Sequence, residues 1–165
     1  MSTVSQAVEK IIAFYDGGVH DIEHFLKVYA LAKTIGEQEG LDAKTQETLE
    51  LAAIVHDIAC PLCREKYGNT AGKHQELESP PLVSPFLAEL NVAETQIRRI
   101  DWLVAHHHTY TGVDGLDHRI LLEADFLVNA GETPMPGSAL RAARERVFQT
   151  QTGKRLLDAM FLGKT

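Results

Sequence analysis

The sequence predicts an all-α fold: a single-domain helical bundle of about six to eight helices. Apolar residues recur at helical spacing over most of the 165 residues, and clusters of glycine and proline separate these periodic segments. No segment alternates apolar and polar residues as a half-buried strand would. The chain is 44% apolar and 24% charged, which is typical of a globular protein with a core of its own.

The N-terminal third predicts three helices. A glycine pair at 17–18 is expected to stop the first of them. Gly40 is expected to end the second, Asp42 to cap the third, and Pro61 to close the third, because proline cannot continue a helix. These helices are expected at residues 3–15, about 21–39 and about 43–58.

The rest of the chain predicts shorter helices between loops rich in glycine and proline. Residues 64–73 are expected to form a loop, and prolines are expected to break or kink the helix that follows it. The helices are expected at about 73–90, 92–108 and 117–130, followed by one or two C-terminal helices within 137–165. We expect one domain over residues 1–165, with a motif-bearing core at about 20–131.

Composition and charge exclude several classes of partner. The net charge of −7 disfavours binding to the backbone of a nucleic-acid duplex or to an anionic membrane. No segment approaches the ~20 apolar residues of a membrane span, and the first residues lack the apolar stretch of a signal peptide. A single CxxC pair, Cys60 and Cys63, is expected to be free thiols in a reducing compartment. We therefore expect a cytoplasmic protein.

Four polar residues lie on apolar faces of the expected helices. Burying such groups without partners costs about 2–7 kcal/mol each, and more for a charge. Each position alone has an ordinary explanation: a core histidine with a partner, a buried acceptor, or a solvated helix end at the histidine run 106–108. Together they favour one divalent cation that satisfies them all. The four residues are His24, His56, His107 and Asp125.

In this order of residues the chain resembles the HD superfamily of metal-dependent phosphohydrolases, as a small stand-alone member. The resemblance rests on five segments within residues 20–131: HDIEHFLKVYALAKTIGEQEGLD, LELAAIVHDIA, KHQELESPPLVSPFLAEL, IDWLVAHHHTYTG and ILLEADFLVNAGE. It implies that one metal is bound by His24, His56, Asp57 and Asp125. Superfamily members with two metals have further histidines, which match His74, His107 and His108 here, with His106 as the alternative in the run.

The resemblance also implies an activity. The protein would cleave a phosphate ester of a nucleotide or another small phosphorylated metabolite, with Asp57 bridging two cations and a hydroxide between them as nucleophile. One or two divalent ions would serve, among Mn, Fe, Co, Ni, Zn and Mg. Cyclic-dinucleotide hydrolysis is not supported, because Cys60 stands where that branch has lysine and no GYP follows the histidine run.

Further residues are candidates for supporting roles. Lys27 lies one helical turn after His24, so it could reach a substrate phosphate, or it could be a solvated lysine. His20 could transfer a proton or orient a ligand, or have no role. Arg64 could line the mouth of the site, but a surface charge without a role is the favoured interpretation, and His118 is expected at the surface.

Two other functions fit the same ligand pattern. A diiron oxygenase of this fold would use the same histidines and aspartates to activate oxygen. A signalling module that binds metal without catalysis is the other alternative, although the intact ligand set disfavours it. We expect a small phosphorylated, nucleotide-like substrate as partner, and neither a nucleic-acid duplex nor a membrane; a homodimer is compatible with the sequence.

Overall fold

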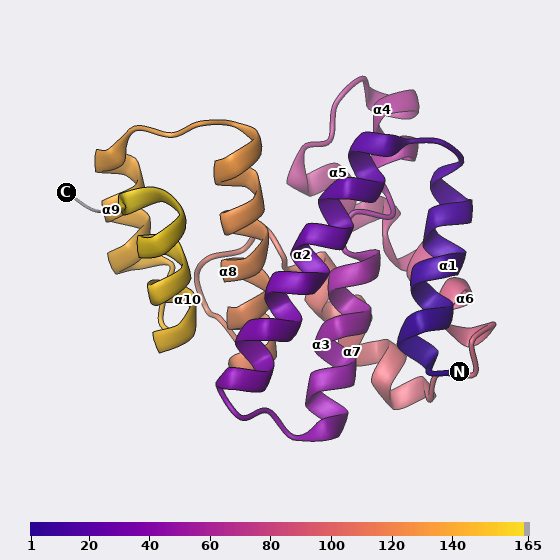
Figure 1. Ribbon diagram of the computed structural model, residues 1–165. Helices are drawn as coiled ribbons and strands as arrows, with labels where there is room; N and C mark the ends of the chain where they lie inside the picture. The colour runs from indigo at the N-terminus through magenta and orange to yellow at the C-terminus, as the bar shows by residue number, and fades with distance from the viewer. Residues whose placement is uncertain (164–165) are drawn as a thin grey trace.

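The computed structural model describes residues 1–163, and these residues form helices and no strands (Figure 1). This confirms the all-α prediction. The helices are α1 Thr3–Tyr15, α2 Val19–Gln38, α3 Ala43–Val55, α4 Cys60–Tyr67, α5 Gly72–Glu78, α6 Pro80–Ala88, α7 Glu94–Ala105, α8 Gly115–Glu132, α9 Gly137–Arg146, α10 Gln151–Leu157 and the π-helical turn η1 Asp158–Leu162.

Local sequence signals account for the ends of the N-terminal helices. The carboxylate of Asp42 accepts hydrogen bonds from the backbone N–H groups of Lys44 and Thr45, at 3.1 and 3.0 Å, and so caps α3 as expected. The backbone of Asp16, at the end of α1, is left-handed, and the glycine pair follows it. These three helices lie within a few residues of their expected positions.

The segment after α3 differs from the prediction. Residues 60–67, expected to end one helix and begin a loop, form the separate helix α4. Pro61 lies in its first turn, where its missing N–H has no intrahelical partner to lose, so it starts a helix instead of ending one. Pro80 and Pro81 likewise begin α6 and split the expected 73–90 helix at Ser79. Such splits produce more, shorter helices than the six to eight expected.

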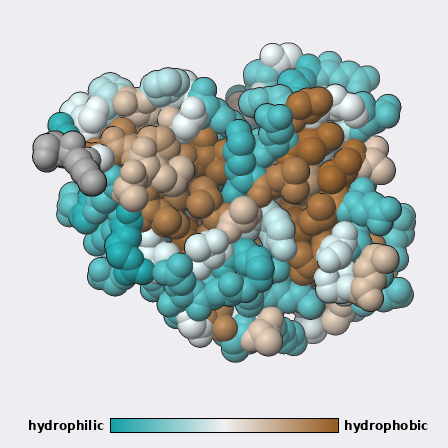
Figure 2. All heavy atoms as spheres, viewed as in Figure 1, coloured by the Kyte–Doolittle hydropathy of each residue, from teal (hydrophilic) through white to brown (hydrophobic). Residues whose placement is uncertain are grey.

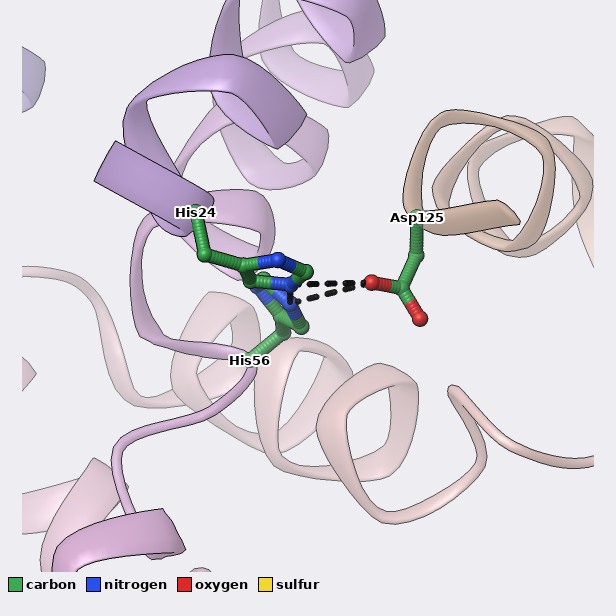
Figure 3. A group of neighbouring side chains, drawn as sticks. All are labelled: His24, His56 and Asp125. Atoms are coloured by element: carbon green, nitrogen blue, oxygen red, sulfur yellow. Dashed lines mark hydrogen bonds and ion pairs between the residues drawn. The ribbon is translucent and has the colours of Figure 1, made fainter. Parts of the chain in front are cut away.

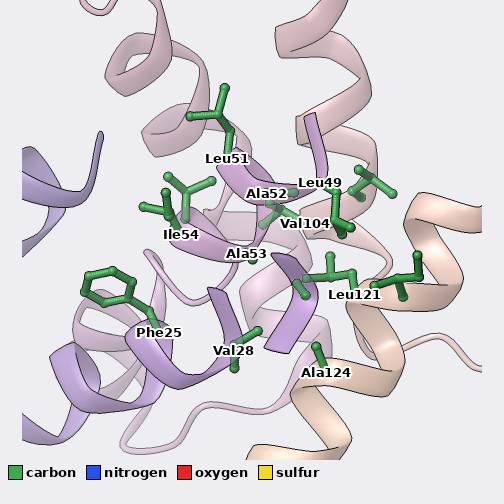
Figure 4. Close-up of a cluster of buried hydrophobic side chains, with 14 of the residues drawn as sticks. Phe25, Val28, Leu49, Leu51, Ala52, Ala53, Ile54, Val104, Leu121 and Ala124 are labelled. Atoms are coloured by element: carbon green, nitrogen blue, oxygen red, sulfur yellow. The ribbon is translucent and has the colours of Figure 1, made fainter. Parts of the chain in front are cut away.

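Helix α3 forms the centre of the core. All eight of its residues from 48 to 55 are buried, and it packs against α1, α2, α7 and α8. Figure 4 shows its leucines and alanines against Phe25 and Val28 of α2 and Leu121 and Ala124 of α8. The second half of α3 is therefore enclosed, and apart from Thr48 and Glu50 its residues are apolar. The buried helix holds whatever follows its C-terminal end in a fixed position.

The C-terminal helices are joined to the core by a buried carboxylate. Glu123 of α8 is fully buried and accepts hydrogen bonds from the backbone N–H groups of Gln149 and Thr150, at 2.6 and 3.0 Å. The Thr150 hydroxyl donates a third, at 2.6 Å. Helix α10 thus packs against α8 and α2 (Figure 1). Among the helices of residues 1–163, none combines the length and the apolar character needed to cross a membrane.

Candidate metal centre

Three central helices bring polar side chains together at one point of the core. His24 projects from the first half of α2 and Asp125 from the middle of α8. His56 is the residue at which α3 ends, and Asp57 follows it in the turn before α4. His107 lies in the turn after α7. The buried packing of α2, α3, α7 and α8 therefore fixes the directions of these side chains.

The first group consists of His24, His56 and Asp125, which point toward one another (Figure 3). The Nε2 atom of His24 lies 3.2 Å from Nε2 of His56 and 3.2 Å from Oδ1 of Asp125. The Nε2 atom of His56 lies 3.4 Å from the same carboxylate oxygen. All three residues are at most 5% exposed. The three donor atoms thus surround a point that water barely reaches.

Asp57 connects this group to a second one. Its Oδ2 atom lies 3.2 Å from Nε2 of His24 and 3.3 Å from Nε2 of His56, whereas its Oδ1 atom lies 3.2 Å from Nε2 of His107. Donor atoms of His56, Asp57 and His107 lie within 4.8 Å of one another, as do those of His107, His108 and Asp125. The two oxygens of one carboxylate therefore face two neighbouring groups of possible metal ligands.

A buried nitrogen without a hydrogen-bond partner tests whether a cation fits. The Nε2 atom of His107 is buried and makes no hydrogen bond, although Oδ1 of Asp57 lies 3.2 Å away. An unsatisfied buried polar atom is costly, and native proteins rarely leave one without a reason. A divalent ion between His107 and Asp57 would satisfy both, and imidazole and carboxylate are suitable ligands. The residues present therefore fit a metal ion.

Backbone hydrogen bonds set the orientation of the imidazoles. Nδ1–H of His56 donates to the carbonyl of Ala53 at 2.7 Å, and Nδ1–H of His107 donates to the carbonyl of Val104 at 2.6 Å. In each ring the other nitrogen, Nε2, faces the cluster, as metal-binding histidines require. His56 caps the end of α3 and His107 lies in the turn after α7, so both protons are donated to carbonyls in the last turn of the preceding helix.

The electrostatics of the cluster favour positive charge. Burial alone would lower the pKa of His24, but the carboxylates of Asp125 and Asp57 outweigh it and raise this pKa to about 10. Burial opposes charge on Asp125 too, yet hydrogen bonds to His24 and His56 hold the pKa of Asp125 well below its usual value. The carboxylates are therefore ionised. They stabilise positive charge on His24 and would stabilise a bound cation in the same way.

A residue that the sequence analysis missed completes the cluster. Nδ1 of His24 lies 3.0 Å from both carboxylate oxygens of Glu132, the last residue of α8. This contact fixes the tautomer that leaves Nε2 of His24 facing the other ligands. Spacing alone could have indicated Glu132, because position 132 lies seven residues after Asp125 and both residues therefore occupy one face of α8.

The cluster opens into a small cavity of about 190 Å³. His20 is exposed and lines this cavity, one helical turn before His24. Arg64 also lines it and is paired with Asp21. Cys60 lines it as a buried free thiol.

Two candidate site residues are not brought to the cluster. His74 of α5 stacks on Tyr67, with ring centroids 3.8 Å apart, and its Nδ1 lies 3.0 Å from the amide oxygen of Asn69. The short helices α4 and α5 thus hold it apart from the other histidines. Lys27 lines a different cavity, because it lies three residues further along α2 than His24.

The histidine run divides between two environments. His107 is buried at the cluster and His108 adjoins it, with ring centroids 3.8 Å apart. His106 instead stacks on Trp102, at 4.1 Å between centroids. The expectation of a surface position for His118 is wrong, because its ring is fully buried against Trp102 and lies 2.9 Å from the His106 carbonyl.

Comparisons with known proteins bear on the family and the fold. A model of the HD domain family matches residues 21–130. Among solved structures, a predicted HD superfamily hydrolase from an uncultured Thermotogales bacterium is similar, with a TM-score of 0.66 and 22% identity over 96% of this chain and 83% of that chain. At this identity the likeness concerns the fold. None of the curated proteins matches the chain.

Proposed function

This chain belongs to the HD domain family, and on that premise we propose that it is a metal-dependent phosphohydrolase. Its substrate would be a phosphate ester of a nucleotide or another small phosphorylated metabolite. One observation carries the proposal: ionised aspartates and Nε2 atoms of three histidines converge in the core, one of these nitrogens without a partner. Such a site is suited to divalent cations and not to an apolar ligand.

The chain offers ligands for two cation positions. His24, His56 and Asp125 would hold the first, together with one oxygen of Asp57. His107 and His108 would hold the second, together with the other Asp57 oxygen. His74 has no part in this assignment. When bound, the cations would activate water as a nucleophile and offset the negative charge of the phosphate.

Residues around the cavity would position the substrate. The cavity of about 190 Å³ has room for little more than a phosphoryl group next to the cations, and its walls are polar side chains. Arg64 at the mouth is held by Asp21 and would attract an anionic ester. His20 is exposed at the same cavity, and we assign it proton transfer to the leaving oxygen.

A combined assay tests this proposal. The purified protein is analysed for bound metals and then screened for phosphate release from nucleotides, sugar phosphates and simple esters. We expect metal in the wild type and its loss, together with the loss of phosphate release, in His56→Ala and Asp57→Ala. Unchanged metal content in both variants would show that the ligand assignment is wrong.

The same assay separates the oxygenase alternative. A diiron oxygenase would contain iron, consume oxygen and release no phosphate from any ester. That combination would contradict the proposed phosphohydrolase while leaving the metal centre intact.

A further inference from the structure

A second cavity lies beside the metal centre. Its volume is about 490 Å³, well above the 190 Å³ of the cation cavity, and the two cavities share one wall residue, Glu132. Its other walls are apolar side chains of α2, α8 and η1, with Lys27 at the edge. We call it the α2–α8 cavity; its apolar lining residues are Ala30, Leu31, Leu127, Val128 and Met160.

The position of the α2–α8 cavity suits the organic part of a substrate. His24, Lys27 and Leu31 occupy one face of α2, at spacings of three and seven residues. Lys27 and Leu31 are therefore displaced from His24 by about 4.5 and about 10 Å along the helix axis. A phosphate held among the histidines would place its ester group within this range. The carboxylate of Glu132, bonded to His24, marks the border between the two cavities.

The walls of the α2–α8 cavity select a type of organic group. Leu127 and Val128 are buried, so that their side chains offer only apolar contact at the base of the cavity. Figure 2 shows apolar surface gathered over α8 and the C-terminal segment on this face of the molecule. Hydroxyl groups of a sugar would lose their water against such walls without gaining hydrogen bonds. An apolar ring or chain has no hydrogen bonds to water to lose, so its transfer to the cavity is favourable.

Lys27 adds one polar requirement. Lys27 is an exposed residue at this cavity, and within residues 1–163 its ammonium group has no hydrogen-bond or ion-pair partner. An ammonium group beside apolar walls favours an anionic or carbonyl oxygen as partner. We propose that the α2–α8 cavity binds the organic group of the phosphate ester, and that this group is apolar and carries an acceptor oxygen directed toward Lys27. This inference rests on the proposed phosphohydrolase function.

A series of alkyl phosphates tests the inference, because its members share one leaving-group chemistry. We expect kcat/KM of the metal-loaded protein to rise about fourfold per methylene from ethyl to hexyl phosphate, as each methylene leaves water. Ala30→Trp fills the cavity from an exposed position of α2 and should abolish this rise. Glu23→Trp, an exposed position on the same helix away from the cavity, should retain the rise.

Lys27→Met tests the polar requirement separately. The wild type should have a higher kcat/KM for hexyl phosphate with a terminal carboxylate than for plain hexyl phosphate. In the variant the ratio of these two values should be about tenfold smaller. Met160→Glu places a charge on the apolar wall and should also flatten the chain-length dependence. It provides the measurement if Ala30→Trp does not fold, as judged by circular dichroism and metal content.

The outcomes distinguish the two proposals. If no phosphate ester is hydrolysed, the proposed function fails, and with it the role of the cavity. If every alkyl phosphate is hydrolysed with equal kcat/KM, or if folded Ala30→Trp keeps the wild-type dependence, the cavity assignment alone is overturned. A dependence that disappears in Ala30→Trp and persists in Glu23→Trp supports the assignment.

Discussion

Glu132 shows how a residue outside the ligand set can control it. Its carboxylate holds Nδ1 of His24 and so keeps Nε2 directed at the other ligands. We expect Glu132→Ala to weaken cation binding about 10–100-fold, because the ring of His24 loses its fixed tautomer and orientation. The cation affinity of Glu132→Gln should lie between those of Glu132→Ala and the wild type, because its amide oxygen can still accept a hydrogen bond from Nδ1–H. Titration calorimetry with Mn²⁺ measures this.

Glu23→Ala is the matched control for this prediction. Glu23 is an exposed carboxylate next to His24 in the sequence, and its removal changes the charge near the site by the same amount. Equal loss of affinity in Glu23→Ala and Glu132→Ala would mean that net charge, and not orientation of His24, accounts for the effect.

Two candidate ligands, His74 and His107, are expected to behave differently. His107 is buried with an unpartnered nitrogen at the cluster, whereas His74 stacks on Tyr67 away from it. His107→Ala should therefore lower the metal content of dialysed protein, and His74→Ala should leave it unchanged. Elemental analysis of both variants measures this. Loss of metal in His74→Ala would show that α4 and α5 rearrange when metal binds.

At the residue scale, the sequence predicts donors better than it predicts their supports. His24, His56, His107 and Asp125 stood out because a polar residue on an apolar helix face needs a partner. The carbonyl groups that orient the imidazole rings, and the buried position of His118, depend on how helix ends meet. No periodicity of side chains encodes such contacts. The place of His74 likewise depends on a stack with Tyr67 that spacing does not reveal.

At the scale of elements, Gly153 is required by the carboxylate beneath it. A Cβ atom at this position would collide with Oε2 of Glu123 and approach the Thr150 hydroxyl to 2.7 Å. Glu123 cannot move freely, because it accepts three hydrogen bonds from Gln149 and Thr150. The C-terminal helices therefore depend on a close approach of α10 to α8.

Gly153→Ala should destabilise the protein although alanine is the better helix former. The gain in helix propensity is about 1 kcal/mol. Breaking the hydrogen bonds of Glu123 leaves buried donors without partners, at about 1–3 kcal/mol each. With more than one bond affected, the loss exceeds the gain, and urea unfolding should show a lower free energy of unfolding.

Gly131→Ala provides the comparison for Gly153→Ala. A Cβ atom at Gly131 meets only the ring of Phe161, at 3.8 Å, which is an ordinary contact. This substitution within α8 should stabilise the protein by up to about 1 kcal/mol. If Gly153→Ala stabilised it to the same degree, Glu123 could not be the rigid link between α8 and α10.

Helix ends in the middle of the chain illustrate the limit of local signals. Proline is disfavoured in the interior of a helix but fits its first turn. Pro61 is therefore compatible both with the end of one helix and with the beginning of another. The packing of α4 against α5, with Cys63 fully buried, favours the beginning of a new helix at this proline. Asp42, by contrast, caps α3 through its own side chain, and no distant contact is needed to predict it.

For the molecule as a whole, the candidate metal centre lies where the core helices meet, and the pKa values of its aspartates are held below the usual range within the core. Ionised groups in such a place weaken the fold unless a partner offsets their charge. A cation that binds the folded chain and not the unfolded one adds stability according to its concentration, about 2.7 kcal/mol at 100 times Kd. For a chain of this size that corresponds to a rise in Tm of about 5–10 °C.

We therefore expect chelator-treated protein to unfold at a lower temperature than protein with excess Mn²⁺ or another divalent ion that suits imidazole and carboxylate. Asp57→Ala should lose most of this difference, because both cation positions depend on its carboxylate. Lys27→Met, which lies in the neighbouring cavity, should keep it. Differential scanning calorimetry over a series of cation concentrations measures the shift. An equal shift in Asp57→Ala and the wild type would place the stabilising ion elsewhere on the molecule, and the core cluster would then lose its assignment as the metal centre.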